Sequence, residues 1–324
     1  MRIICRIIAA FALVATCMIV QPAWAADTGL DIDYAEIQPL VPDSLLLDVT
    51  RIGDRLVAVG ERGHVVFSDD GTTWRQAEHV PTRSTLTTVF ARGERLWAAG
   101  HDAVIITSGD RGKTWSRENF EPERMQAVMD LYFEDENHGV AIGSYGLYLV
   151  TVDGGKNWAD SVVDGENDFH LNSMAVFDDG RRIIAGEAGY SYRSFDGGET
   201  WEALDLPYIG SMWGAIRLPN DCVVFYGLRG HAMESCDFGD TWAELDTGTQ
   251  LSLSGAAERD GLAVIAGNSG IVLAREDSGA IRQYLHSSGV DFSSVIALDD
   301  DRFLLVGEDG LHVFPEAETG ETGR

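Results

Sequence analysis

The sequence is poor in positive charge, and after its first 25 residues it has no long stretch with helical periodicity. Its 324 residues include 24 basic and 52 acidic side chains, for a formal charge of −28. This balance argues against nucleic-acid binding, because affinity for nucleic acid comes mainly from Lys and Arg that neutralise phosphates. It also argues against electrostatic docking on anionic lipid. With 45% hydrophobic residues, the chain can still bury a substantial core.

Motifs for catalysis and metal binding are missing as well. The sequence contains no H-E-x-x-H, no C-x-x-C, no G-x-S-x-G after a strand and no EF-hand calcium loop. Gly112-Lys113-Thr114 imitates the end of a P-loop, but a Walker A motif needs its first glycine where Thr107 stands. We therefore predict no catalytic residue, no metal and no cofactor. A carboxylate pair that converges only in the fold would leave no such signature.

The first 25 residues have the organisation of a secretory signal peptide. Arg2 and Arg6 precede an uncharged apolar run over residues 7–20, and Ala23-Trp24-Ala25 is a small-x-small cleavage site. The run of 14 residues is shorter than the roughly 20 that a membrane-spanning helix needs. We predict cleavage near Ala25, export to the periplasm and no membrane insertion afterwards. A lipoprotein attached through Cys17 is the alternative.

Cysteine is scarce, and only Cys222 and Cys236 remain after such a cleavage. They flank Gly227-Leu228-Arg229-Gly230, so a tight hairpin turn at this point would place them nearly opposite one another. In an oxidising compartment this position allows a cross-strand disulfide, with two free thiols as the alternative.

Glycine, in contrast, is abundant and periodic. A G-x-x-G element recurs with its first glycines 40 to 43 residues apart, and one copy keeps only that first glycine. Such a regular period indicates repeated structural units. The seven first glycines are Gly60, Gly100, Gly143, Gly186, Gly227, Gly267 and Gly307.

A second element follows each of the first five turns and contains aspartate, glycine and tryptophan. An Asp carboxylate can accept backbone N–H bonds inside a tight turn, and glycine supplies the positive φ that the turn requires. The tryptophan provides a large apolar body to fill the wedge between sheets. We predict a structural role for the five aspartate–tryptophan pairs, which are Asp69 and Trp74, Asp110 and Trp115, Asp153 and Trp158, Asp196 and Trp201, and Asp237 and Trp242.

Four short strand-like segments per unit, in seven units, predict an all-β protein with the fold of a seven-bladed β-propeller. Each blade would have four antiparallel strands, and residues 31–41 would complete the last blade and close the ring. Residues 26–314 would form one domain, followed by a disordered tail over 315–324. The predicted blades are 44–82, 84–124, 126–168, 170–209, 211–250, 252–291 and 293–314.

The two faces of such a propeller differ in side-chain chemistry. The turns between the second and third strands, together with the linkers between blades, carry aromatic, histidine and arginine residues, which are frequent in interface hot spots. The opposite face is acidic. Each residue taken singly reads as an ordinary solvated loop side chain, but as a group they predict a partner-binding face. The candidates are Arg62, Arg83, His101, Tyr145, His170, Trp213 and Arg229.

The aspartate–tryptophan element resembles the Asp-box of the bacterial-neuraminidase (BNR) repeat. Together with the seven units, the G-x-x-G turns and the leader, it is similar to the photosystem II stability/assembly factor type of BNR propeller. The resemblance implies a non-enzymatic factor that binds an integral membrane protein and assists its assembly or stability. Some relatives accompany permeases of the resistance-nodulation-division class, and the photosynthetic members bind through an arginine-rich patch, which Arg62, Arg83 and Arg229 would resemble here.

Two other functions stay open at this point. Asp-boxes also occur in sialidases, but the early R-I-P sequence of those enzymes is missing, and their propellers have six blades. A sialidase-like glycoside hydrolase and a carbohydrate- or peptide-binding propeller are therefore the alternatives to a protein-binding scaffold, which we expect to be a monomer.

Overall fold

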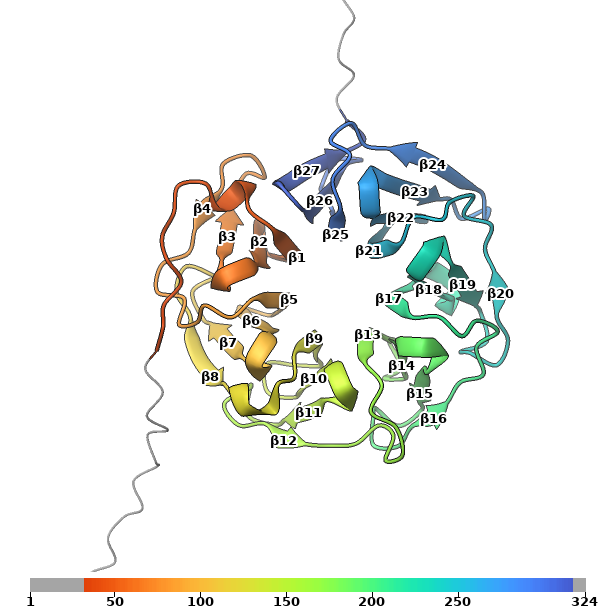
Figure 1. The fold of residues 1–324 in the computed structure, drawn as a ribbon, viewed down its shortest axis with the longest axis horizontal. Helices are drawn as coiled ribbons and strands as arrows, with labels where there is room; N and C mark the ends of the chain where they lie inside the picture. The colour runs from red at the N-terminus through yellow and green to blue at the C-terminus, as the bar shows by residue number, and fades with distance from the viewer. Residues whose placement is uncertain (1–31, 317–324) are drawn as a thin grey trace, which may run out of the picture. The chain divides into compact units, whose positions relative to one another are not determined.

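The computed structural model describes residues 32–316 and has seven antiparallel sheets, six with four strands and one with three. Figure 1 shows the sheets around a central axis, with β1, β5, β9, β13, β17, β21 and β25 innermost. The sequence prediction of an all-β, seven-bladed propeller is confirmed. The predicted leader over 1–25 and most of the predicted tail over 315–324 lie outside the described residues.

The strands follow the chain from the inside of each blade to its outside. Blades one and two comprise β1 (Leu46–Ile52), β2 (Arg55–Gly60), β3 (Val65–Ser68), β4 (Arg75–Gln76), β5 (Leu86–Arg92), β6 (Arg95–Gly100), β7 (Ile105–Ser108) and β8 (Ser116–Asn119). Blades three and four comprise β9 (Val128–Phe133), β10 (Gly139–Gly143), β11 (Tyr148–Thr151), β12 (Ala159–Asp160), β13 (Leu171–Val176), β14 (Arg182–Gly186), β15 (Tyr192–Ser194) and β16 (Glu202–Ala203).

The remaining three blades continue in the same order. They comprise β17 (Met212–Arg217), β18 (Val223–Gly227), β19 (Ala232–Ser235), β20 (Ala243–Glu244), β21 (Leu253–Arg259), β22 (Leu262–Gly267), β23 (Ile271–Arg275), β24 (Ile281–Leu285), β25 (Phe292–Ala297), β26 (Phe303–Gly307) and β27 (Gly310–Phe314). The described helical segments are single 3-10 turns, namely η1 (Val41–Asp43), η2 (Glu61–Gly63), η3 (His101–Ala103), η4 (Pro122–Arg124), η5 (Ser144–Gly146), η6 (Glu187–Gly189), η7 (Pro219–Asp221), η8 (Leu228–Gly230) and η9 (Asn268–Gly270).

The second strand of each blade is covered on both faces, because a neighbouring blade packs against each side of its sheet. All six residues of β2 are buried, for example, and they are mainly β-branched or small. Between blades two and three, the ring of Trp97 stacks on that of Phe133 with centroids 3.8 Å apart, and both side chains are fully buried. Truncating either side chain to alanine would cost about 3 to 5 kcal/mol.

The G-x-x-G motif has a steric reason. In η2, Arg62 and Gly63 both have positive φ, 54° and 72°. A Cβ atom on Gly63 would lie 2.1 Å from the carbonyl oxygen of Thr82, which belongs to the linker into the next blade. A Cβ atom on Gly60 would lie 2.1 Å from the carbonyl oxygen of Leu45. Both glycines are therefore needed because main chain from the linkers passes directly over the turn.

The Asp-boxes are hydrogen-bonded corners between the third and fourth strands. In blade two, Asp110 Oδ1 accepts bonds from the N–H of Lys113 and of Thr114, each 3.0 Å long. Its Oδ2 accepts the Thr114 hydroxyl at 2.6 Å. Trp115 is buried, and its Nε1 donates to Gly112 O at 3.1 Å.

In the first copy the aspartate in this role is Asp70, so the prediction of Asp69 is wrong. The N–H groups of Thr72 and Thr73 donate to Asp70 Oδ1 over 2.8 and 2.6 Å. Asp69 instead forms an ion pair with Arg55 at 2.7 Å. The physical reason is a shorter corner, since Trp74 follows Ser68 by six positions whereas Trp115 follows Ser108 by seven.

The seventh blade has three strands within the described residues, and the prediction that residues 31–41 complete it is wrong. Residues 32–40 form no strand. The N–H of Ala35 donates to Val80 O and that of Gln38 to Gln76 Oε1, both at 2.9 Å, so this segment lies along the outer edge of blade one (Figure 1). The polar partners of the segment lie on blade one, where Arg83 also pairs with Glu36 at 3.0 Å.

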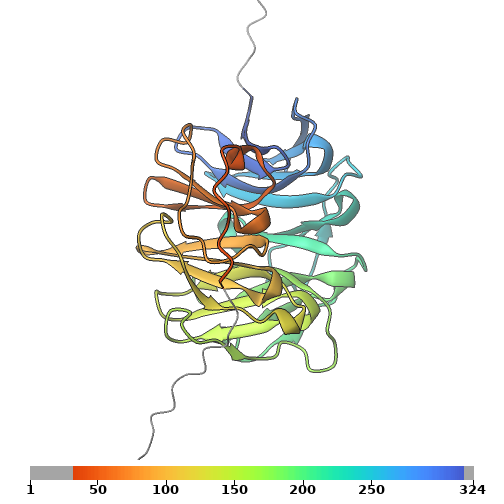
Figure 2. The ribbon, with the colours of Figure 1, turned by 60° about the vertical axis from the view of Figure 1, so that its left-hand side comes forward.

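The ring closes instead by packing and by side-chain bonds between blades seven and one, which lie side by side in Figure 2. β1 packs against β25, and Val41 of η1 is buried in a cluster that includes Leu311 and Val313 of β27. Arg51 pairs with Asp299 at 2.9 Å. Closure therefore depends on these contacts and not on a shared sheet.

Cys222 and Cys236 are joined in a disulfide, with Cα atoms 4.0 Å apart. They lie next to the paired residues Val223 and Ser235, at the open ends of β18 and β19. The bridge closes the end of this hairpin that lies opposite the η8 turn.

Candidate functional site

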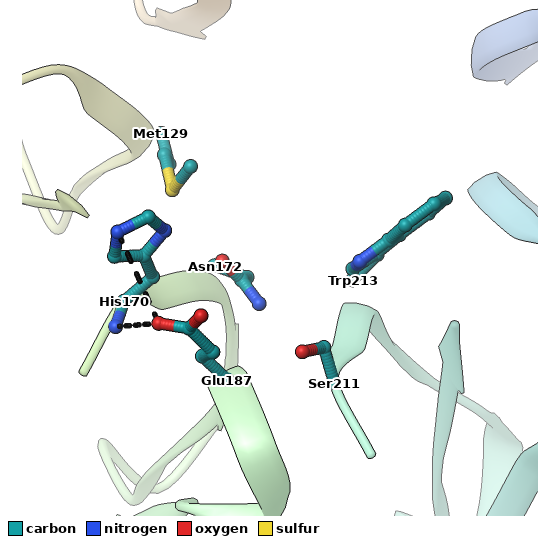
Figure 3. Close-up of a pocket in the computed structure, with 6 residues that line it drawn as sticks. All are labelled: Met129, His170, Asn172, Glu187, Ser211 and Trp213. Carbon is teal, nitrogen blue, oxygen red and sulfur yellow. Dashed lines mark hydrogen bonds and ion pairs between the residues drawn. The ribbon is translucent and has the colours of Figure 1, made fainter. Parts of the chain in front are cut away.

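The face formed by the 3-10 turns and the linkers between blades carries a hollow of about 430 Å³ near the mouth of the central channel. Figure 3 shows His170 and Glu187 on one side of it and Trp213 on the other. Blades three, four and five contribute to it, because β9, β13 and β17 begin at neighbouring points of the ring. The lining residues are Met129, His170, Asn172, Glu187, Ser211 and Trp213.

His170 is held in place by its neighbours. Its main-chain N–H donates to Glu187 Oε2 at 3.2 Å, and its Nε2 lies 3.9 Å from the same oxygen. The ring of Tyr145 stands edge-on to the imidazole, with centroids 4.9 Å apart and an interplanar angle of 80°. Three turns or linkers thus fix the orientation of one side chain at the rim of the hollow.

Large apolar side chains are exposed around this hollow. Met125 is 82% exposed, Tyr145 57%, Ile209 87% and Trp213 36%. We call these four residues the apolar rim. Trp213 lines the hollow, and Tyr145 contacts the lining residue His170. Met125 and Ile209 stand in the linkers that lead to β9 and β17. Exposed apolar side chains that gather around a concavity mark interaction sites.

The predicted partner-binding residues fall into two groups. The structure brings Tyr145, His170 and Trp213 together at the hollow. The other four lie elsewhere on the ring: Arg62 and Arg83 on blade one, His101 on η3 of blade two and Arg229 on η8 of blade five.

The predicted arginines are partly engaged with carboxylates. Arg83 pairs with Glu36, and Arg62 Nε lies 3.7 Å from Glu61. Arg124 of η4 pairs with Asp160 and Glu121, and these hydrogen bonds raise its pKa above the usual range. The structure therefore forms no single arginine patch from these residues.

The turns of blades one and five share the sequence Arg-Gly-His, at residues 62–64 and 229–231, but their histidines have different surroundings. His64 is buried, its Nδ1 lies 3.3 Å from the Ser44 hydroxyl, and burial lowers its pKa. His231 instead stacks on Tyr208, with centroids 4.0 Å apart, and its Nδ1 lies 2.9 Å from Glu244. The repeated letters therefore do not mark a repeated site.

Most of the remaining arginines fasten blades together on the acidic face. Arg217 of blade five pairs with Asp178 of blade four at 2.6 Å, and Arg193 of blade four pairs with Asp240 of blade five at 2.6 Å. Arg275 of blade six pairs with Glu234. The few positive charges of the chain are thus largely committed to structure.

The central channel contains two half-buried carboxylates that sequence reasoning missed, Asp48 on β1 and Asp130 on β9. Burial raises the pKa of both, that of Asp130 to about 7. Each accepts a main-chain N–H from the next blade: Val89 donates to Asp48 and Met174 donates to Asp130, both at 2.8 Å. An aspartate at the third position of the inner strand, directly after two apolar residues, was the available signal.

The same position is used in other blades. Ser294 Oγ donates to Asp48 Oδ1 at 2.7 Å, which joins blade seven to blade one. One position earlier, Asn172 Nδ2 donates to Met212 O at 2.8 Å, which joins blade four to blade five. The channel carboxylates therefore act as inter-blade acceptors within a ring of polar side chains.

Among residues 32–316 one group has the spacing of a metal site, namely Cys222, Glu234 and Cys236. Its two sulfurs form the disulfide and offer no thiolate ligand. No helix in the described part of the chain is long and apolar enough to cross a membrane.

A family model described as photosynthesis system II assembly factor YCF48 matches residues 118–209. No curated protein matches the chain. Among solved structures, YCF48 bound to D1 peptide is similar, with 18% identity over 87% of this chain and 98% of that chain and a TM-score of 0.70. YCF48 from Cyanidioschyzon merolae follows, with 18% identity, 88% and 98% coverage and a TM-score of 0.68.

A streptogramin B lyase structure is also similar, with 11% identity, 87% and 96% coverage and a TM-score of 0.72. At these identities the solved structures establish the fold only. The family match over residues 118–209 and the fold shared with the two YCF48 structures confirm the resemblance of this β-propeller to the photosystem II assembly factor type.

Proposed function

We propose that this chain is an exported, non-enzymatic propeller that binds a protein partner with the apolar rim and its hollow. We propose further that the partner is an integral membrane protein, with a permease of the resistance-nodulation-division class as the first candidate, and that binding assists its assembly or stability. The observation that carries the proposal is that Tyr145 and Trp213 border one concavity, while the neighbouring linkers expose Met125 and Ile209.

The chemistry of the rim fits a polypeptide partner. Aromatic residues and methionine are enriched at the centres of interfaces, and hot spots form where such side chains are fully desolvated on binding. The hollow adds a few polar groups, Asn172, Glu187 and Ser211, that can hydrogen-bond a main chain. The YCF48 structure with a D1 peptide supports the proposal, since a propeller of similar fold there holds a peptide.

The hydrolase alternative receives less support from the same residues. The hollow has no arginine among its lining side chains, so it lacks the cationic clamp that a sialidase needs. The channel carboxylates Asp48 and Asp130 are occupied by main-chain N–H groups. One specific observation favours a carbohydrate-binding module, because Trp213 lines the same hollow as the polar Asn172 and Glu187.

A pull-down separates these functions. The purified chain, tagged and incubated with detergent-solubilised membranes, should recover a specific membrane protein, and Ile209→Glu should abolish the recovery because it places a charge in the apolar rim. Val152→Glu is the matched control, since Val152 is 72% exposed in the Asp-box of blade three, on the opposite face.

Three results would count against the proposal. Equal recovery by Ile209→Glu and the unchanged protein would exclude the apolar rim as the binding site. Recovery lost only in Arg62→Glu with Arg229→Glu would move the site to the arginines. Turnover of a fluorogenic sialoside that is lost on mutation of Glu187 would favour the hydrolase.

A further inference from the structure

Among residues 32–316 no strand covers the outer edge of the seventh blade, and we propose that this edge accepts an extended segment of a partner polypeptide that carries lysine or arginine. The incoming segment would pair with β27 as the fourth strand of that blade. This second interaction surface is separate from the apolar rim, because it lies on the circumference of the ring between blades six and one.

The other six blades show what is missing. In four of them the first outward-facing carbonyl of the third strand accepts an N–H from the residue after the fourth strand. Ala77 donates to Val65 O and Leu245 to Ala232 O at 2.9 Å, and Ser161 donates to Tyr148 O and Leu204 to Ser191 O at 2.8 Å. Val306 pairs with Leu311 as Val59 pairs with Val65, so the corresponding carbonyl in blade seven is that of Leu311. No residue in 32–316 donates to it.

The strand register identifies the free main-chain groups. In blade one the N–H of Gly60 donates to His64 O, and hydrogen-bonded and non-hydrogen-bonded pairs alternate along an antiparallel ladder. Val65 and Phe67 therefore direct their N–H and C=O groups toward β4. By the same register, Leu311 and Val313 direct theirs away from β26, whereas His312 bonds to it.

Burial agrees with an open edge. All four residues of β3, whose outer edge pairs with β4, are buried, whereas Leu311, His312 and Val313 of β27 are only half-buried. Such an edge is a ready template for pairing with another chain. Main-chain pairing along an exposed edge is one of the general modes of peptide recognition.

The occupant follows from charge. Glu308 and Asp309 are exposed just before β27. Glu316 follows the strand, and its carboxylate accepts the N–H and hydroxyl of Ser287 in blade six. The rest of this chain does not complement them, because residues 26–31 read A-D-T-G-L-D and residues 317–324 read A-E-T-G-E-T-G-R. A second copy of the chain would bring another formal charge of −28 to the same edge. A basic segment from another protein fits the edge best.

The fourth strands of the other blades indicate that the segment need not be apolar. β4, β12, β16 and β20 are two-residue strands whose side chains are largely exposed. Selection at the open edge therefore rests on main-chain bonds and on charge.

Hydrogen exchange of the 15N-labelled full chain tests the proposal, with the capped heptapeptide Lys-Thr-Val-Lys-Val-Thr-Lys as the probe. In the free protein the amides of Leu311 and Val313 should exchange as fast as loop amides, and that of Phe67, which pairs with Arg75 of β4, should be protected. Added peptide should slow exchange at Leu311 and Val313 by about tenfold or more. The same peptide with every amide N-methylated has no main-chain donor left and should protect neither amide.

Each contrary result overturns the proposal. Slow exchange at Leu311 in the free protein at every protein concentration would mean that a segment of this chain already covers the edge. Slow exchange that appears only at high protein concentration would mean that a second copy does. Fast exchange that millimolar peptide leaves unchanged would mean that the edge accepts no strand.

A charge variant tests the choice of occupant. Glu308→Gln with Asp309→Asn should weaken peptide binding about fivefold at low salt and much less at high salt, because exposed charges are screened. The matched control, Glu199→Gln with Asp205→Asn, removes two exposed charges from blade four and should leave binding unchanged. Equal affinity for all three proteins would refute the basic segment. Ile209→Glu should retain peptide binding, so failure of the proposed function and failure of this inference are distinguishable.

Discussion

Asp48 offers the sharpest test of how this ring is held closed. Its carboxylate accepts the N–H of Val49 and of Val89, each at 2.8 Å, and the hydroxyl of Ser294 at 2.7 Å, so one side chain joins blades seven, one and two. Asp48→Ala leaves the two main-chain donors without this partner. Each buried donor left unsatisfied costs about 1 to 3 kcal/mol, so we expect a loss of roughly 2 to 6 kcal/mol.

Such a loss is large against the roughly 5 to 15 kcal/mol by which proteins are stable. Urea unfolding followed by tryptophan fluorescence measures it. With a urea dependence of about 3 kcal/mol per molar, the midpoint should fall by roughly 1 to 2 M. The control is Ser294→Ala, which removes only the closing hydroxyl and should cost about 1 kcal/mol.

Two outcomes would refute the reasoning. A midpoint for Asp48→Ala equal to that of Ser294→Ala would show that the main-chain acceptor role is unimportant. An unchanged midpoint in both variants would show that the side-chain bonds do not hold blades seven and one together, and that packing of β1 against β25 is sufficient.

Three further predictions concern other parts of the propeller. Because burial raises the pKa of Asp130 to about 7, the folded protein holds this proton more tightly than the unfolded chain does, and the resulting stability is present below pH 4 and lost as the pH rises through 7. The contribution of Asp130 to this loss of unfolding free energy between pH 4 and 7 is about 4 kcal/mol, and Asp130→Asn should remove it. Urea titrations at several pH values measure the slope, and an unaltered slope in the variant would contradict the raised pKa of Asp130. Asp110→Ala removes the two carboxylate oxygens that accept bonds from Thr114 and should lower the free energy of unfolding by about 2 kcal/mol. Asp69→Ala leaves the Asp-box bonds of blade one in place and should lower it less. The bridge between Cys222 and Cys236 closes a loop over a sequence separation of 14, so its reduction should lower the free energy of unfolding by about 3 kcal/mol. Cys222→Ser with Cys236→Ser should remove the effect of reductant. Equal melting of the parent protein with and without reductant would show that the bridge contributes nothing.

The repeat predicted the architecture well because its landmarks satisfy local requirements. Gly60 and Gly63 are needed where linker main chain passes within van der Waals distance, and Asp110 is needed to accept N–H groups from its own turn. Such needs recur in every blade and are therefore visible as a period. In the first Asp-box Asp69 was chosen in place of Asp70, because one residue is missing between the aspartate and the tryptophan. The aspartate that accepts the bonds is the one two positions after the serine, which here is Asp70 after Ser68.

The candidate site could be predicted only in part. Tyr145, His170 and Trp213 come from three different blades, and they meet because the η5 turn of blade three and the starts of β13 and β17 are neighbours in the ring. Met125 and Ile209, the most exposed members of the apolar rim, have no sequence signal, since a lone methionine or isoleucine in a linker reads as any loop residue. Arg62 and Arg229 share a motif and yet stand on blades one and five.

The one-dimensional pattern alone determined the number of blades, their strand order and the corners that hold them, because each depends on residues within about 40 positions of one another. Only the tertiary structure decided how the ring closes, which carboxylates lie in the channel and which exposed side chains border one hollow. Each of these is a contact between blades, and Asp48 with Ser294 shows the reason: 246 residues separate two atoms that lie 2.7 Å apart, and no local spacing records that proximity.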